Sequence, residues 1–134
     1  MTLFFCLDDR NGLSFNNRRQ SRDRAVLADM ASQLTGVLLV DPMSEKMMIR
    51  HEIPYEILTE ETLPAEDAQY FVEQRPLDGL LLLAKKVVIY RWNQIYPADR
   101  YLETPLQETG FSLAEVNQFP GYSHETITRE VYVR

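Results

Sequence analysis

The densest group of residues able to bind a charged ligand is a run of arginines near the N-terminus. Four arginines stand between positions 18 and 24, in the run Arg18, Arg19, Gln20, Ser21, Arg22, Asp23, Arg24. Guanidinium groups bind phosphate and carboxylate groups through paired hydrogen bonds. The same run is more often typical of a solvated helix start, with weak surface ion pairs to Asp23 and Asp29. The sequence therefore predicts either an anion site or an exposed charged face here.

The charge of the whole chain limits the kind of anion. Its 134 residues carry a formal net charge of -6. Residues 1–24 hold five arginines against three aspartates, whereas residues 41–80 hold ten acidic residues against three basic ones. A general nucleic-acid-binding surface needs many cations, because binding depends on releasing phosphate counterions. We therefore expect a local site for a small anionic or nucleotide-like molecule, and no general nucleic-acid binding.

Other residue types that often carry out chemistry are sparse. With one cysteine, Cys6, and two histidines, His51 and His124, the chain lacks a four-ligand zinc set, and we predict no metal site. Cys6 falls in an apolar run without a basic neighbour, which favours a buried, inert thiol. His51 follows an expected short helix, where it meets the C-terminal dipole. His124 lies on a polar turn, which favours a role in the turn itself.

Length and composition are those of one globular domain. Hydrophobic residues make up 45% and charged residues 25%, as in ordinary globular domains. The apolar run at 80–84 is far shorter than the roughly 20 residues that cross a bilayer, and the apolar start at 3–7 is too short for a signal peptide. We expect a single domain over residues 1–134, located in the cytoplasm and without a membrane-spanning segment.

Alternating elements in the first half predict a parallel sheet. Residues 3–7 and 37–40 are short apolar runs typical of buried strands. Between them, apolar side chains at helical spacing predict an amphipathic helix over residues 21–34, with Ser21 as its candidate N-cap. Asp41 followed by Pro42 predicts a second, short helix that ends near position 50. The order strand, helix, strand, helix is typical of a parallel sheet.

The second half predicts a mixed sheet that finishes in an antiparallel hairpin. Residues 111–119 and 126–133 alternate apolar and polar side chains on either side of Pro120 and Gly121. Before them we expect strands at 55–58, 69–73 and 87–92, an acidic turn at 59–67, and a short helix at 77–84 broken by Gly79. Helices on both faces should bury a core that includes Phe4, Cys6, Val26, Leu27, Met30, Leu34, Val37, Leu39, Val88 and Tyr90.

The order of these motifs resembles the dihydrofolate reductase family. The run Leu7, Asp8, Asp9, Arg10, Asn11, Gly12 after an apolar strand is similar to that family's first strand and substrate-side loop. Residues 87–93 and 98–102 resemble a later strand and the segment downstream of it. The resemblance covers about two-thirds of the chain. It implies an α/β fold: a single domain of three layers, α/β/α, around a mixed sheet.

The family's functional residues carry over only in part. In an ungapped register, the position of its pterin-binding carboxylate falls at Val26, and Asp23, one helical turn earlier, is the candidate catalytic acid. The family's paired glycines, whose amides face a dinucleotide phosphate, are replaced by residues 73–76, Glu-Gln-Arg-Pro. A glutamate repels a phosphate and a proline lacks an amide donor. Asp41 and Pro42 stand where the family binds a 2'-phosphate.

Two functions from different classes remain open. The first is a non-catalytic, reductase-like module without a cofactor, which binds a small ligand through Arg18, Arg19 and Arg22. Tyr90 and Trp92 would supply a stacking surface, although aromatic strand residues more often pack in a core. The alternative is a divergent NADPH-dependent oxidoreductase that acts on a pterin-like or other heterocyclic substrate through Asp23. Residues 73–76 distinguish the two hypotheses.

Overall fold

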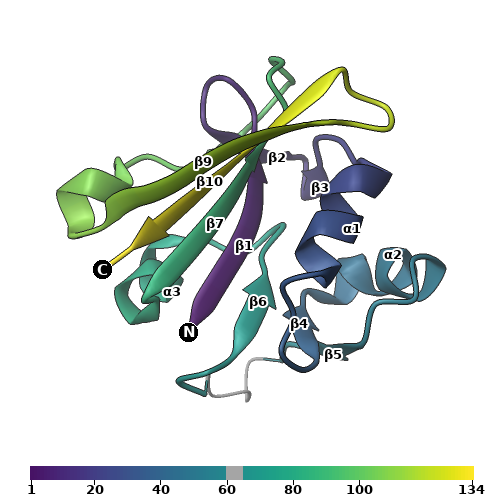
Figure 1. The fold of residues 1–134 in the computed structure, drawn as a ribbon, viewed down its shortest axis with the longest axis horizontal. Coiled ribbons are helices and arrows are strands. Elements are labelled where there is room, and N and C mark those ends of the chain that lie inside the picture. The colour runs from purple at the N-terminus through teal and green to yellow at the C-terminus, as the bar shows by residue number, and fades with distance from the viewer. Residues whose placement is uncertain (60–64) are drawn as a thin grey trace.

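A mixed sheet of seven strands forms the centre of the protein (Figure 1). The structure, a computed structural model, describes residues 1–59 and 65–134. In spatial order the strands are β5 (Tyr55–Ile57), β4 (Leu38–Val40), β6 (Gln69–Phe71), β1 (Thr2–Leu7), β7 (Lys86–Arg91), β10 (Thr126–Val133) and β9 (Ser112–Pro120). Strands β5 to β7 in this order are mutually parallel, whereas β10 is antiparallel to both β7 and β9. The predicted mixed sheet with a terminal antiparallel hairpin is confirmed.

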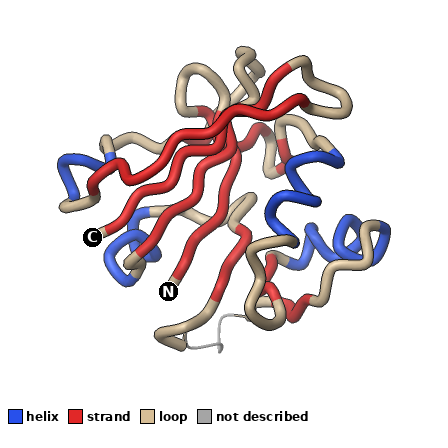
Figure 2. The backbone as a smooth tube through the Cα atoms, in the orientation of Figure 1, coloured by secondary structure: helices blue, strands red, loops and turns tan. Residues whose placement is uncertain are grey.

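Helices cover both faces of the sheet, which gives the three predicted layers (Figure 2). Helices α1 (Arg24–Ala31) and α2 (Glu45–Arg50) pack on one face, and α3 (Asp78–Leu83) packs on the other. Because side chains alternate along a strand, Leu3 and Phe5 of β1 point into the core beneath α3, while Phe4 points into the core beneath α1. None of the helices in the described ranges is long and apolar enough to cross a membrane.

The first helix is shorter than predicted at both ends. Asp23, and not Ser21, is its N-cap, because the Asp23 carboxylate accepts a hydrogen bond from the backbone amide of Ala25. The Ser21 hydroxyl instead lies 3.1 Å from the ring nitrogen Nε2 of His124. The helix ends at Ala31, so Leu34 lies beyond it and is only partly buried.

Some details of the predicted elements are wrong. Gly79 does not break α3, since it lies inside an uninterrupted helix with open space where a Cβ would stand. Val37 precedes β4 and is 46% exposed, because the strand begins only at Leu38. Cys6, Leu34 and Leu39 are partly buried, while the remaining predicted core residues, apart from Val37, are buried. Part of the predicted acidic turn, positions 60–64, lies outside the described residues.

A small second sheet replaces the loop expected over residues 10–21. It consists of β2 (Gly12–Phe15), β3 (Arg18–Arg19) and β8 (Arg100–Tyr101), with β2 antiparallel to both partners. Asn16 and Asn17, at φ 50° and 57°, make the two-residue turn between β2 and β3. Two consecutive residues with positive φ are the requirement of the tightest hairpin turns. This hairpin carries Arg18 outward and Arg19 toward the main sheet.

Candidate functional site

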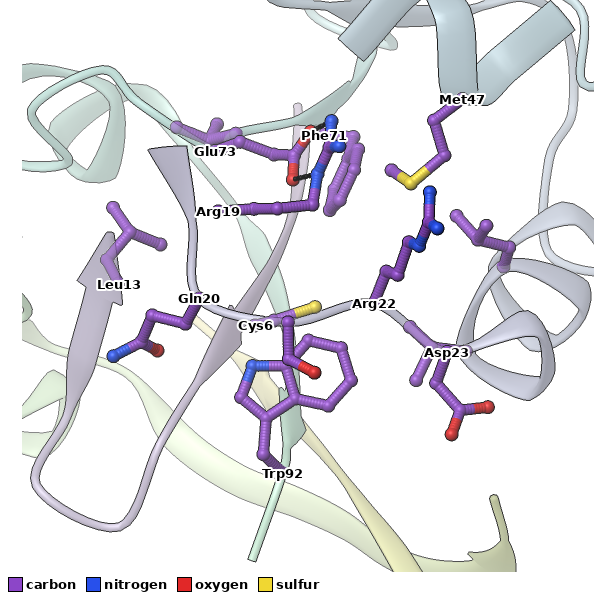
Figure 3. Close-up of a pocket in the computed structure, with 14 residues that line it drawn as sticks. Cys6, Leu13, Arg19, Gln20, Arg22, Asp23, Met47, Phe71, Glu73 and Trp92 are labelled. Atoms are coloured by element: carbon purple, nitrogen blue, oxygen red, sulfur yellow. Dashed lines mark hydrogen bonds and ion pairs between the residues drawn. The ribbon is translucent and has the colours of Figure 1, made fainter. Parts of the chain in front are cut away.

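A pocket lies between the end of β1, the start of α1 and the strands β6 and β7 (Figure 3). Side chains nearly close it, since the space open to the centre of a water molecule is about 20 Å³. The apolar lining consists of Cys6, Leu13, Val26, Leu27, Met47, Phe71, Val72 and Trp92. The polar lining consists of Arg19, Gln20, Ser21, Arg22, Asp23 and Glu73. Arg19 and Arg22 of the arginine run therefore meet the candidate acid, Asp23, at one pocket.

Arg19 is neutralised within the pocket wall. Its Nε lies 2.7 Å from Oε2 of Glu73, and its Nη2 lies 2.9 Å from Oε1, so the pair is bidentate. The Glu73 side chain is only 6% exposed, and the Ser44 hydroxyl donates a further hydrogen bond to it. The hydrogen bond to Glu73 raises the pKa of Arg19 above its ordinary value. Arg19 thus balances a buried carboxylate within the pocket wall.

The Asp41 carboxylate binds the backbone amides of the two residues Glu73 and Gln74, shortly after the end of β6. One carboxylate oxygen, Oδ2, accepts hydrogen bonds from the amides of Glu73 and Gln74, at 3.0 and 3.1 Å. The other, Oδ1, accepts from Nε of Arg75 at 3.0 Å. Asp41 was predicted as a helix N-cap, but its side chain makes no capping hydrogen bond because it reaches across to β6. The two amides that a phosphate would need are bound to an internal carboxylate.

Asp23 joins the start of α1 to the turn between β9 and β10. Its carboxylate accepts hydrogen bonds from the backbone amides of Ala25, Tyr122, Ser123 and His124, and lies 2.9 Å from Nδ1 of the His124 ring. Burial by itself would raise the pKa of Asp23, but the hydrogen bonds from Tyr122 and His124 outweigh it and hold the pKa well below its ordinary value. Figure 3 shows the carboxylate directed away from Cys6 and Arg22. This placement does not support the catalytic role considered for Asp23.

His124 is the buried partner that completes this cluster, which we call the Asp23–His124 cluster. Its Nε2 lies 2.9 Å from the Tyr96 hydroxyl and 3.1 Å from the Ser21 hydroxyl, and its ring stacks on Trp92 with centroids 4.7 Å apart. The order Ser21, His124, Asp23 resembles a nucleophilic triad. However, the Tyr96 hydroxyl shares Nε2, and the side chain is only 3% exposed. The cluster is best explained as a structural connection between helix and hairpin.

Of the remaining predicted ligand residues, Arg22 and Trp92 line the pocket, whereas Arg18 and Tyr90 do not. Arg22 is exposed, its guanidinium points toward Met47 in Figure 3, and it has no ion pair within the described part of the chain. Arg18 is exposed and lies outside the pocket. Tyr90 is buried beneath α1, where its hydroxyl donates to Asp29 at 2.6 Å, so it offers no stacking surface. Trp92 does line the pocket.

The Cys6 thiol lines the pocket but is not activated. Burial raises its pKa well above the ordinary value, and the negative charge of Glu73 raises it further. A thiol with a raised pKa is protonated near neutral pH and is a poor nucleophile. Across the described residues, no three His, Cys, Asp or Glu side chains are grouped so as to hold a metal ion.

Comparison with solved structures identifies the fold. Dihydrofolate reductase from Enterococcus faecalis, solved in complex with NADP(H) and RAB-propyl, matches with a TM-score of 0.69 over 99% of this chain and 95% of that chain. The two sequences are 9% identical, so the match concerns the fold alone. No protein-family model matches the chain, and no curated protein matches it in sequence. The chain has the dihydrofolate reductase fold, as the resemblance implied.

Proposed function

We propose that this protein is a small-molecule-binding module on the dihydrofolate reductase fold, and that it works without a dinucleotide cofactor. The ligand is an anionic or nucleotide-like molecule held in the pocket beside α1. The fold supports a reductase-like ancestry for the pocket, but fold alone does not transfer an activity. The proposal therefore rests on the residues at the pocket and at the end of β6.

The observation that carries the proposal is the position of the Asp41 carboxylate. A dinucleotide phosphate is bound through free backbone amides, and here the amides of Glu73 and Gln74 already donate to Asp41. A phosphate at this edge would also face the buried carboxylates of Asp41 and Glu73. Each lost hydrogen bond to a charged group costs about 1.5 to 3 kcal/mol. The residues at this edge do not fit a dinucleotide phosphate.

The pocket beside α1 offers complementary chemistry for a smaller ligand. Val26, Met47, Phe71 and Trp92 give it apolar walls. A flat molecule would pack against these walls once side chains of the lining move apart. Arg22 stands in the lining as a guanidinium that forms no ion pair with any carboxylate of residues 1–59 and 65–134. Since Arg19 is paired and Arg18 is outside, anion recognition in this pocket falls to Arg22.

A thermal-shift screen of folates, nucleotides and phosphorylated metabolites tests the proposal. A ligand that binds only the native state raises the melting temperature, and we expect an anionic heterocycle to do so. Arg22→Ala should weaken binding of that compound roughly tenfold, through loss of one charged hydrogen bond. Arg18→Ala is the matched control and should leave affinity unchanged. Equal affinity in Arg22→Ala and the control would place the site elsewhere.

An activity assay separates this proposal from the NADPH-dependent alternative. The purified protein should not oxidise NADPH in the presence of dihydrofolate, and the absorbance of NADPH at 340 nm should decay no faster than without protein. A protein-dependent decay that Asp23→Asn abolishes would establish the oxidoreductase and overturn the binding module. Asp23→Asn is informative here only at a temperature where its circular dichroism matches the wild type.

A further inference from the structure

A second hollow adjoins the pocket at the start of α1 and shares Arg22, Asp23 and Leu27 with it. It opens between the first turn of α1, the end of α2 and the turn that joins β9 to β10, and α1 and α2 stand side by side in Figure 1. Its basic and aromatic lining is Arg22, Arg24, Arg50, His51 and Tyr122, and we call it the arginine groove. Its non-atom space, the open side included, is about 570 Å³.

The charges of the arginine groove are not balanced by acids. Within the described ranges, Arg22, Arg24 and Arg50 form no ion pair, whereas the guanidiniums of Arg19, Arg75, Arg91 and Arg129 each contact a carboxylate. One acidic side chain, Asp23, also lines the groove. Its oxygens already accept hydrogen bonds from Ala25 and from the hairpin turn. Three guanidiniums therefore share one hollow in which the one carboxylate among the described lining residues is already bound to backbone amides.

The positive charges of the groove act together on the neighbouring His51 side chain. Burial lowers the pKa of His51, and the positive charges of Arg24, Arg50 and Arg22 lower it further. Arg24 is held in place by the exposed ring of Tyr122, with its guanidinium carbon 4.6 Å from the ring centroid. Like charges at close range repel, and in a chain with a net charge of -6 acidic partners are plentiful. An external anion is the group that removes this repulsion.

We propose that the arginine groove binds a multiply charged phosphate group, as a diphosphate or a phosphomonoester of a small molecule. Guanidinium groups from α1 and α2 can contact different oxygens of such a group, and paired N–H donors match phosphate geometry. A single carboxylate would leave most of this positive charge uncompensated. A nucleic-acid strand is less suited, because the groove is local and the surrounding protein is acidic.

Titration with inorganic pyrophosphate tests the arginine groove directly. We expect one molecule to bind per chain, with affinity that falls as salt concentration rises. In nuclear magnetic resonance spectra, pyrophosphate should shift the ring signals of His51 and Tyr122 and leave those of Trp92 in place. Shifts at Trp92 without shifts at His51 would overturn the proposal, as would the absence of any binding.

A pair of double variants with equal charge change gives the control. Arg24→Gln with Arg50→Gln should weaken pyrophosphate binding about thirtyfold or more, from the loss of two charge-assisted contacts. Arg10→Gln with Arg18→Gln alters two exposed arginines outside the groove and should change affinity less than threefold. Equal losses in the two double variants would mean that only the net charge matters, and would overturn the site.

Two further measurements separate this proposal from its alternatives. If a ten-nucleotide single strand binds and pyrophosphate does not, the ligand of the groove is a nucleic acid, and the small-phosphate proposal is wrong. Neither double variant touches Arg22 or the pocket walls, so both should keep the thermal shift given by the pocket ligand. Loss of pyrophosphate binding with an intact pocket response supports a separate groove. Loss of both together contradicts it.

Discussion

Two regions of the molecule use arginines in opposite ways. At the end of β6, which we call the Asp41 edge, Arg19 pairs with Glu73 and Arg75 pairs with Asp41. In the arginine groove, beside α1, the guanidiniums lie together without carboxylate partners in the described part of the chain. The arginine run of the sequence is divided between the two regions. The same residue type is thus structural in one place and available to a ligand in the other.

Burial explains the difference. Asp41 is 2% exposed and Glu73 is 6% exposed, and a buried charge without a partner is strongly destabilising, so each of them pairs with a guanidinium. Arg22 and Arg24 are exposed to water and need none. At the Asp41 edge the guanidiniums compensate buried carboxylates. In the arginine groove the buried carboxylate of Asp23 is bound by backbone amides and His124, so the charge of the guanidiniums remains for an external anion.

The largest expected effect comes from breaking the Asp41 edge. Arg19→Ala leaves the Glu73 carboxylate buried without its bidentate partner, and we expect the free energy of unfolding to fall by about 3 kcal/mol. Urea denaturation followed by circular dichroism measures the change. Arg18→Ala, the neighbouring exposed arginine, should change stability by less than about 0.5 kcal/mol. Similar losses in both variants would show that the pair with Glu73 is not structural.

Removing the negative charge of Asp23 in the Asp23–His124 cluster should lower the free energy of unfolding by a smaller amount. Asp23→Asn presents an amide to the backbone donors of Tyr122 and Ser123, and we expect a loss of about 2 kcal/mol at pH 7. The folded protein holds the pKa of Asp23 below its unfolded value of about 4. The charge therefore contributes fully above pH 4, and its contribution declines as pH falls below that value. The stability difference between wild type and variant should shrink toward pH 2; a constant difference from pH 7 to pH 2 would contradict the assignment.

The smallest changes in stability are expected when two glycines are replaced by alanine, and the two changes should have opposite signs. At Gly121 an added Cβ would overlap the His124 carbonyl oxygen and lie 2.8 Å from Oδ2 of Asp23, so Gly121→Ala should destabilise by about 1.5 kcal/mol. At Gly79, inside α3, a Cβ meets open space, and Gly79→Ala should stabilise by about 0.5 to 1 kcal/mol. Differential scanning calorimetry of both variants measures the signs. A neutral Gly121→Ala would mean that the turn does not pack closely on Asp23.

Much of the fold could be predicted because its signals are local. Apolar runs gave β1, β4 and β7, and the alternation around Pro120 and Gly121 predicted the β9–β10 hairpin. The β2–β3 hairpin was missed, although Asn16 and Asn17 are residue types that tolerate positive φ. The helix start was misplaced by a local ambiguity. Ser21 and Asp23 are both good N-caps, and the choice between them depends on His124, far along the chain.

The site could be predicted only in part, because its side chains pair with residues far away in the sequence. The arginine run predicted a positive region, but the pairing of Arg19 depends on Glu73, 54 positions away. His124 meets Asp23 across 101 positions, and no spacing rule relates them. Asp41 has the local signature of a helix cap, yet its side chain binds the amides after β6. Local patterns identify residue types with chemical potential, and only the fold shows which of them are already paired.

Calorimetric titration with NADPH, with pyrophosphate saturating the arginine groove, measures whether the Asp41 carboxylate excludes a dinucleotide from the end of β6. Because Asp41 occupies the amides of Glu73 and Gln74, we expect no binding heat from NADPH at submillimolar concentration. The saturating pyrophosphate ensures that contacts of NADPH phosphates with Arg24 and Arg50 do not produce the signal. A stoichiometric heat of binding under these conditions would contradict the account and would favour an NADPH-dependent oxidoreductase.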